Sequence, residues 1–120
     1  MKVTQIMQHL KGKTYAEVVK SVSVDIDDGG CCGYADCETL DHVKVLENAG
    51  NAVLHDVVKI EYDEDYGEQR AVVVNFIFDL GDEKGIILGY DMRAGSQFGC
   101  SCGAYCILKY DNEEVNSVEW

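Results

Sequence analysis

The six cysteines are the most versatile chemical groups of this 120-residue chain. They fall into two groups, each beside glycines that let the backbone turn tightly: Cys31, Cys32 and Cys37, and Cys100, Cys102 and Cys106. Zinc takes four soft ligands in a tetrahedron, so the two groups, with His42 in reserve, are a candidate structural metal site. Their spacing departs from cysteine pairs separated by two residues, and free cysteine is often simply buried. We therefore expect no cofactor, with zinc as the alternative.

Catalysis by one of these thiols is not expected. A nucleophilic cysteine needs a nearby cation or imidazole to lower its pKa, and only His42 is close in sequence. The chain also has no phosphate-cradling glycine loop and no Ser-His-Asp order. We predict a protein that is not an enzyme and has no catalytic residue.

The strongest functional signal is negative charge. The chain has 22 Asp and Glu against 10 Lys and Arg, a formal net charge of −12. Residues 1–60 carry −3 of this charge and residues 61–120 carry −9. Such a charge exceeds the magnitude of about 2–8 that solubility asks of a small domain, and it repels nucleic acid and anionic lipid. It favours a basic protein surface as the partner and argues against direct nucleic-acid or membrane binding.

The predicted partner-binding surface combines acids with tyrosines, because aromatic side chains supply contact area and carboxylates steer a basic partner. Its candidate residues are Glu61, Tyr62, Asp63, Glu64, Asp65, Tyr66, Glu68, Asp79, Asp82 and Glu83. A second alternative is a nucleotide pocket between the 95–103 and 31–37 loops, whose glycines expose amide donors. Only four cations, Arg70, Lys84, Arg93 and Lys109, lie in the second half to support such a pocket.

Apolar periodicity predicts a single domain, 1–120, of the β-rich α+β class: an antiparallel sheet of about five strands with one short N-terminal helix. Val3, Met7 and Leu10 have helical spacing and Gly12 can end that helix, while residues 15–20 fit either a helix or the start of a strand that continues to Ile26. Residues 31–37 are expected to form a loop. Leu54, Val58, Ile60 and Tyr62 are expected on one side of a strand, with Lys59 and Glu61 opposite.

The second half contains the clearest strands. Residues 70–80 alternate with apolar side chains on both faces, which predicts a central strand. Residues 81–85 form a hairpin turn, residues 86–92 return antiparallel, and residues 104–110 make a last strand before a polar, acidic tail. Because one helix covers little of a sheet that is apolar on both faces, a homodimer is predicted.

No stretch reaches the roughly 18–20 apolar residues of a membrane span, and the first residues lack the apolar run of a signal peptide. We therefore expect a cytoplasmic protein whose cysteines are reduced.

The order of these features resembles a family of small uncharacterised phage and prophage domains. The resemblance rests on Leu10-Lys11-Gly12-Lys13-Thr14 before a valine-rich strand, the paired Cys31-Cys32, and the strong hairpin. The family members lack a cluster like Cys100-Ser101-Cys102. The resemblance implies a β-rich domain in a viral or mobile-element setting and brings no activity with it. By analogy with small acidic phage proteins, it points to an inhibitor of a host nucleic-acid-handling or defence protein.

Overall fold

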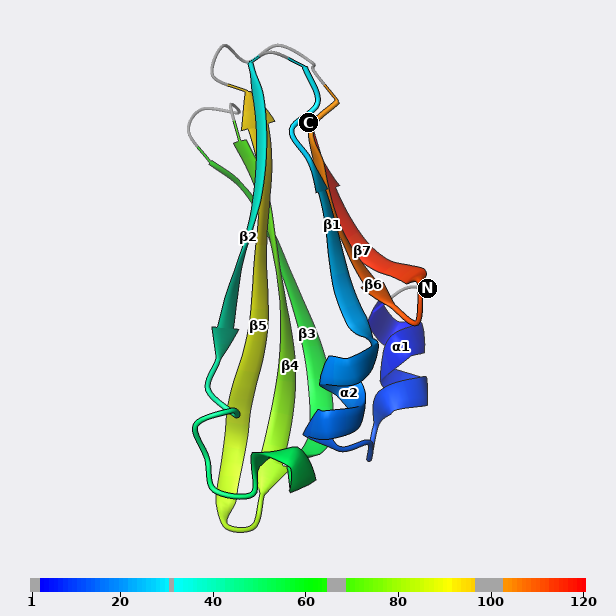
Figure 1. Ribbon diagram of the computed structural model, residues 1–120, viewed down its shortest axis with the longest axis vertical. Helices are drawn as coiled ribbons and strands as arrows, with labels where there is room; N and C mark the ends of the chain where they lie inside the picture. Colours follow the sequence, from blue (N-terminus) through cyan, green and yellow to red (C-terminus); the bar gives the residue numbers. More distant parts are fainter. Residues whose placement is uncertain (1–2, 31, 65–68, 97–102) are drawn as a thin grey trace.

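Seven strands form two antiparallel sheets that pack face to face in this computed structural model, which describes residues 3–30, 32–64, 69–96 and 103–120. The larger sheet has the order β2-β5-β4-β3, with β2 Gly33–Asp41, β3 Val53–Glu64, β4 Gln69–Leu80 and β5 Glu83–Ser96. The smaller has the order β1-β6-β7, with β1 Val22–Asp27, β6 Tyr105–Tyr110 and β7 Glu113–Glu119. Figure 1 shows the long, twisted larger sheet and the shorter sheet on one of its faces.

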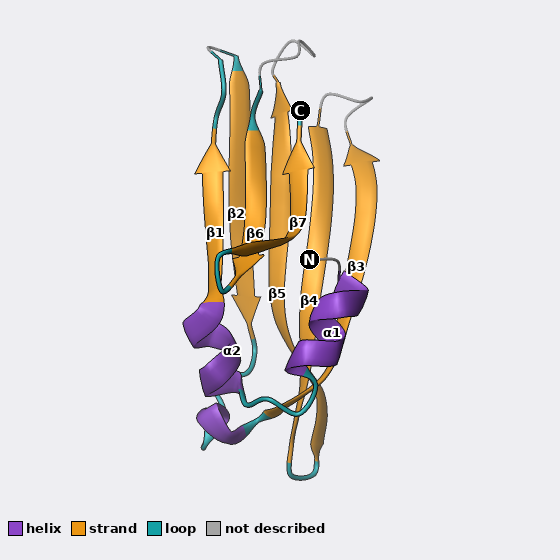
Figure 2. Ribbon diagram, turned by 90° about the vertical axis from the view of Figure 1, so that its right-hand side faces the viewer, coloured by secondary structure: helices purple, strands orange, loops and turns teal. Residues whose placement is uncertain are grey.

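Two short helices, α1 Val3–Leu10 and α2 Tyr15–Ser21, lie at the same end of the sandwich, below the smaller sheet (Figures 1 and 2). A 3-10 turn, η1 Ala49–Asn51, lies beside α2. The molecule measures 48 × 24 × 19 Å, and its long axis follows the strands. The β-rich α+β class is confirmed. Instead of the expected single sheet of about five strands, the fold has two sheets with seven strands in total.

The sequence explains the two helices locally. Gly12 follows α1 with φ 90°, a left-handed conformation that glycine adopts without strain, and it ends the helix as predicted. Thr14 then begins α2 with a capping box, in which the Thr14 side chain accepts from the Glu17 amide and the Glu17 carboxylate accepts from the Thr14 amide. The ambiguous residues 15–20 are therefore helical, and the strand begins at Val22.

A β-bulge in β3 separates Leu54 from the apolar residues with which it was predicted to share a face. The register against β4 shifts between Leu54 and Asp56, so Leu54 and Val57 both enter the core. Val58 and Ile60 consequently face outward, with 37% and 49% of their surface exposed. Lys59 and Glu61 lie on the inner face, so Val58 and Ile60 share one side, with Lys59 and Glu61 opposite, as predicted, and Leu54 lies on the other side from the one expected. One extra residue exchanges the faces of every position after it.

Two further segments differ from the expected structure. Residues 33–37 are the start of β2, paired with β5, instead of a loop. The acidic tail forms β7, which pairs with β6 through a positive-φ turn at Asp111 and Asn112. Both are polar strands at sheet edges, where apolar alternation is weak and the sequence signal is correspondingly poor. β4 does lie inside its sheet, and β5 is its antiparallel partner, as predicted.

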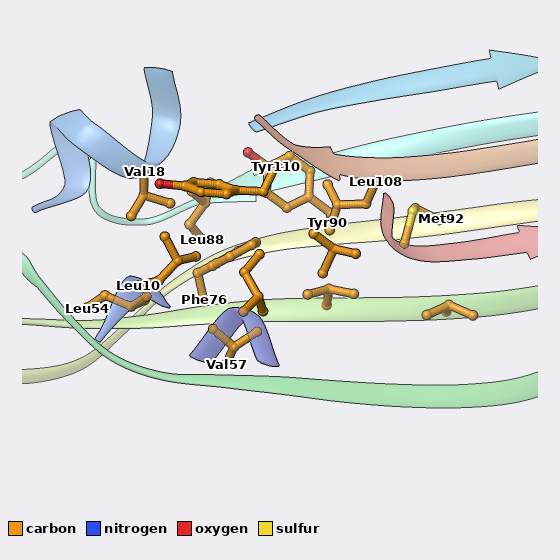
Figure 3. Close-up of a cluster of buried hydrophobic side chains, with 14 of the residues drawn as sticks. Leu10, Val18, Leu54, Val57, Phe76, Leu88, Tyr90, Met92, Leu108 and Tyr110 are labelled. Atoms are coloured by element: carbon orange, nitrogen blue, oxygen red, sulfur yellow. The ribbon is translucent and has the colours of Figure 1, made fainter. Parts of the chain in front are cut away.

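The core fills the space between the two sheets and the helices (Figure 3). Phe76 of β4 and Tyr90 of β5 meet edge to face, with ring centroids 5.9 Å apart, and Leu108 of β6 packs from the opposite sheet. At the helical end, Tyr15 meets Phe78 edge to face at 5.6 Å. Leu108, Tyr15 and, from α1, Leu10 thus tie the smaller sheet and both helices to one face of the larger sheet, whose other face is not covered by any described element (Figure 1).

Candidate functional site

The fold separates the two predicted acidic segments. β3 and β4 run antiparallel, so Glu61 and the backbone of residues 62–64 lie near one end of the long axis, and the β4–β5 turn with Asp79, Asp82 and Glu83 lies at the other (Figure 1). Asp65, Tyr66 and Glu68 lie outside the described residues. The structure therefore does not bring the ten predicted residues into one patch.

A different set of acids gathers at the end of the sandwich away from the helices, which we call the acidic end. It consists of the described side chains of Asp27, Asp28, Asp36, Glu61 and Glu119. β1 and β7 end there, β2 begins there, and β3 runs toward it, so residues far apart in the sequence become neighbours (Figures 1 and 2). None of Asp27, Asp28, Asp36 and Glu119 is among the predicted binding residues, because only the topology brings them to this end.

The two arginines at the acidic end are already engaged. Arg93 donates to Asp91 Oδ2 at 3.1 Å on the outer face of the larger sheet. Arg70 lies on the inner face, where its Nη1 donates to the Glu119 carbonyl at 3.3 Å and its guanidinium stacks over Trp120, with Cζ 5.2 Å from the ring centroid. Two lysines also pair with acids: Lys59 with Glu61 at 2.7 Å and Lys109 with Asp25 at 2.5 Å. At the other end of the long axis, Lys84 lies in the β4–β5 hairpin beside Asp82 and Glu83.

A groove opens beside β7 at the acidic end. The smaller sheet has three strands and the larger has four, so β7 packs toward β4 and β5, and among the described strands none follows it over β3. The groove has a volume of about 480 Å³ and is lined by Glu61 of β3, by Arg70, Ala71 and Val72 of β4, and by residues 117–119 of β7. α1 covers β3 only nearer the helical end (Figure 2).

Of the predicted metal-ligand cysteines, the structure places Cys37 and Cys106 next to each other and Cys32 apart from both. Cys37 of β2 and Cys106 of β6 face each other across the core, and their thiols share a hydrogen bond. This bond lowers the pKa of Cys37, and the same bond together with burial raises the pKa of Cys106. Cys37 is therefore the thiol of the pair that ionises first.

Cys32 lies apart from this pair. Its sulfur is 3.5 Å from Ser96 Oγ, next to the start of β2, whereas Cys37 is opposite Met92, roughly 13 Å further along the strand. A zinc ion lies about 2.3 Å from each of its sulfur ligands, so Cys32 and Cys37 cannot share one in this arrangement. Among the described residues no group of three or more His, Cys, Asp and Glu side chains is arranged to hold a metal. Cys31, Cys100 and Cys102 lie outside the described residues.

The cations needed by the alternative nucleotide pocket do not converge. Arg70 and Arg93 lie on opposite faces of the larger sheet, Lys84 lies in the β4–β5 hairpin at the far end, and Lys109 pairs with Asp25 at 2.5 Å. Of the two loops, residues 33–37 are strand and residues 97–102 are outside the described part of the chain. The described residues thus offer no set of cations for a phosphate.

The uncovered face of the larger sheet carries the apolar side chains that motivated the homodimer prediction. Leu40, Val58 and Ile60 are exposed there, and Val73, Ile77 and Ile87 are half-buried beside them. Asp36 and Glu38 of β2 share this face. The homodimer remains a prediction.

Comparison of the chain with protein-family models, curated proteins and solved structures finds no match. None of the helices in the described part of the chain has the length and apolar character needed to span a membrane. The charge and geometry of the acidic end and its groove must therefore carry the functional argument alone.

Proposed function

We propose that this protein is a small acidic binding module that docks, through its acidic end, onto a basic surface of a partner protein. The observation that carries the proposal is the charge arrangement: five carboxylates from four different strands and one strand-end loop lie toward one end, where both arginines are already paired and Lys59 compensates Glu61 alone. Such a potential speeds association with a cationic surface and repels phosphate backbones.

The partner class follows from the same chemistry. A protein surface that is basic enough to be attracted to these carboxylates is typical of nucleic-acid-handling proteins, which bind phosphate groups through Lys and Arg. The acidic end competes for those side chains, so we propose that the module acts as an inhibitor or decoy of a host nucleic-acid-handling or defence protein. The phage or mobile-element setting is part of this proposal and rests on the sequence resemblance.

The proposal is tested with two charge-neutralised variants of matched size. One carries Asp27→Asn, Asp28→Asn and Asp36→Asn at the acidic end, and the control carries Asp82→Asn, Glu83→Gln and Glu113→Gln away from it. Binding to a panel of purified basic DNA-binding domains is measured between about 0.05 M and about 0.5 M salt, where the screening length changes severalfold.

We expect affinity to fall steeply with salt, duplex DNA to compete, and only the acidic-end variant to weaken binding. Equal weakening in the two variants would show that net charge alone drives association. Affinity that is unchanged across the salt range would contradict the proposal.

A further inference from the structure

The free edge of β7 presents a defined pair of backbone groups to the groove. Val118 pairs with Cys106, and the Trp120 amide donates to the Ala104 carbonyl at 2.9 Å, so residues 118 and 120 hydrogen-bond toward β6. In an antiparallel pair the intervening residues direct their N–H and C=O groups away from the partner strand. Ser117 and Glu119 therefore direct theirs toward the groove.

Two contacts at this edge agree with that direction. The Ser117 amide donates to the side-chain oxygen of its neighbour Asn116 at 2.9 Å, and the Glu119 carbonyl accepts from Arg70 Nη1 at 3.3 Å. The remaining two groups, the Ser117 carbonyl and the Glu119 amide, have no partner strand among the residues that the structure describes. They form an acceptor and a donor two residues apart.

This spacing matches the requirement of a parallel strand. In a parallel pair, consider a residue of the added strand that lies opposite residue j of β7. Its N–H donates to the carbonyl of residue j−1, and its carbonyl accepts from the N–H of residue j+1. A residue placed opposite Val118 would thus donate to the Ser117 carbonyl and accept from the Glu119 amide. An antiparallel strand would instead need the Glu119 carbonyl, which Arg70 occupies.

The groove also determines which side chains such a strand should carry and which way they would point. Its residue opposite Val118 would point inward, over Val72 and Val118, which are both buried and apolar. The residues on either side would point outward, beside Ser117 and Glu119. Glu61 and Glu119 line the groove, and Lys59 pairs with Glu61 at 2.7 Å. Among the described lining residues the cation is Arg70, which is held by Trp120 and the Glu119 carbonyl, so the Glu119 carboxylate is the group left to attract a basic residue. An apolar residue flanked by Lys or Arg is therefore complementary.

We propose that an extended segment of a basic partner protein binds in this groove as a parallel strand added to the edge of β7, with an apolar residue opposite Val118 and a Lys or Arg beside Glu119. The inference rests on the proposed function, because it names the part of the basic partner that the acidic end receives. Recognition by strand addition draws affinity from main-chain hydrogen bonds and specificity from alternate side chains.

The test uses a synthetic peptide of about six residues whose only apolar residue is one central valine flanked by lysines. Two N-methylated versions form a matched pair. Methylation of the valine nitrogen removes the N–H that reaches the Ser117 carbonyl, whereas methylation of the following lysine nitrogen removes an N–H that points away from β7. Binding is followed by Trp120 fluorescence and by hydrogen exchange of the Glu119 amide.

We expect valine methylation to weaken binding about fivefold or more, the value of one hydrogen bond, and lysine methylation to change it little. The Glu119 amide should exchange more slowly in the complex. Equal effects of the two methyl groups, unchanged exchange at Glu119, or no binding at about 1 mM peptide would each overturn the proposal.

Variants of the protein provide the second arm. Glu119→Pro removes the donor without touching the β6 ladder, and Glu119→Gln keeps the donor but removes the charge. We expect a loss of about fivefold or more for the first and a smaller loss for the second, with thermal unfolding confirming that both fold. A natural partner that is sensitive to the Asp27, Asp28 and Asp36 substitutions but indifferent to Glu119→Pro would refute strand addition and leave the proposed function standing. Indifference to both sets would refute the proposed function itself.

Discussion

Arg70 of β4 lies over the ring of Trp120, with Cζ 5.2 Å from the ring centroid, and its Nη1 reaches the carbonyl of Glu119 at 3.3 Å. One side chain of the larger sheet thereby fixes the end of β7 in the smaller sheet. We expect Arg70→Ala to destabilise the fold by about 1 kcal/mol, from one cation–π contact and one hydrogen bond near the surface.

Trp120 is the only tryptophan, so its fluorescence reports this contact directly. Arg70→Ala should change the emission of the folded state as well as the midpoint of urea unfolding. Lys84→Ala, in the β4–β5 hairpin at the far end, is the control and should change neither. Emission identical to that of the unchanged protein would show that the stacking is not maintained in solution.

Asn75 leaves no room for a side chain on Gly89. A Cβ at Gly89 would lie 2.6 Å from Asn75 Oδ1, closer than the two atoms can pack. We expect Gly89→Ala to cost about 1 kcal/mol of unfolding free energy, since the Asn75 side chain must turn away. In an Asn75→Ala background the same substitution should cost nothing. A double-mutant cycle by chemical denaturation measures this coupling, and additive effects would exclude it.

The Cys37 thiol should react with iodoacetamide at lower pH than an ordinary cysteine, because the hydrogen bond from Cys106 lowers the pKa of Cys37. Cys106→Ala removes that bond and should shift the pH profile of Cys37 alkylation upward. Peptide mapping by mass spectrometry separates Cys37 from the other thiols, with Cys32 as the internal control. A profile that Cys106→Ala leaves in place would contradict the hydrogen bond.

Alkaline pH should destabilise the protein through Tyr90. Burial, followed by the charge of Asp41, raises the pKa of Tyr90 to about 12, above its ordinary value of 10.0. The unfolded chain therefore loses this proton first. The stabilising contribution is fully present below pH 10 and falls by up to about 1.4 kcal/mol per pH unit until pH reaches about 12.

Tyr90→Phe should make the decline of stability between pH 10 and 12 shallower. Tyr105→Phe, on the outer face of the smaller sheet, is the matched control. Urea unfolding at a series of pH values measures both. Parallel declines in the two variants would mean that other groups dominate the alkaline transition.

Thr14 should contribute to stability through the capping box of α2. Its side chain accepts from the Glu17 amide, and the hydrogen bonds that Glu17 receives in return lower the pKa of that carboxyl. Thr14→Ala should cost about 1 kcal/mol, whereas Thr14→Ser keeps an N-cap oxygen and should cost less. Because the pKa of Glu17 is lowered in the folded state, the part of the capping box made by the Glu17 carboxylate is present above the ordinary Glu pKa and is lost as pH falls through the folded value, whereas the bond from the Glu17 amide to Thr14 remains. Thermal unfolding at neutral and acid pH compares the two variants.

The sequence predicts the interior of the fold better than its edges. β4 and β5 were recognisable because Val72, Val74, Phe76 and Phe78 alternate along a long run, and Gly12 marked the end of α1. β2 and β7 were missed because both are polar edge strands. Leu54 lies on the opposite face from Val58 and Ile60, contrary to the prediction, because nothing in the sequence of residues 54–57 indicates the bulge.

The candidate site was less predictable than the fold for a topological reason. Charge counting drew attention to the 61–83 region, but Asp79 and Glu61 end up at opposite ends of one hairpin. Asp27 and Glu119 both align with Tyr105 of β6, and Asp36 comes to the same end of the molecule through the larger sheet, so only the pairing of the strands gathers them there. The groove arises from a difference in strand number between the sheets, which no residue type encodes.

The pairing of β1 with β6 has a consequence for synthesis on the ribosome. β1 is made early, yet β6, with which it pairs among the described strands, follows about 80 residues later. During translation β3, β4 and β5 can pair as consecutive hairpins before the smaller sheet has formed. Phe76, Leu88 and Met92 then line a solvent-exposed surface on the nascent chain. A holdase chaperone would recognise that surface, and its release would coincide with the arrival of the final hairpin.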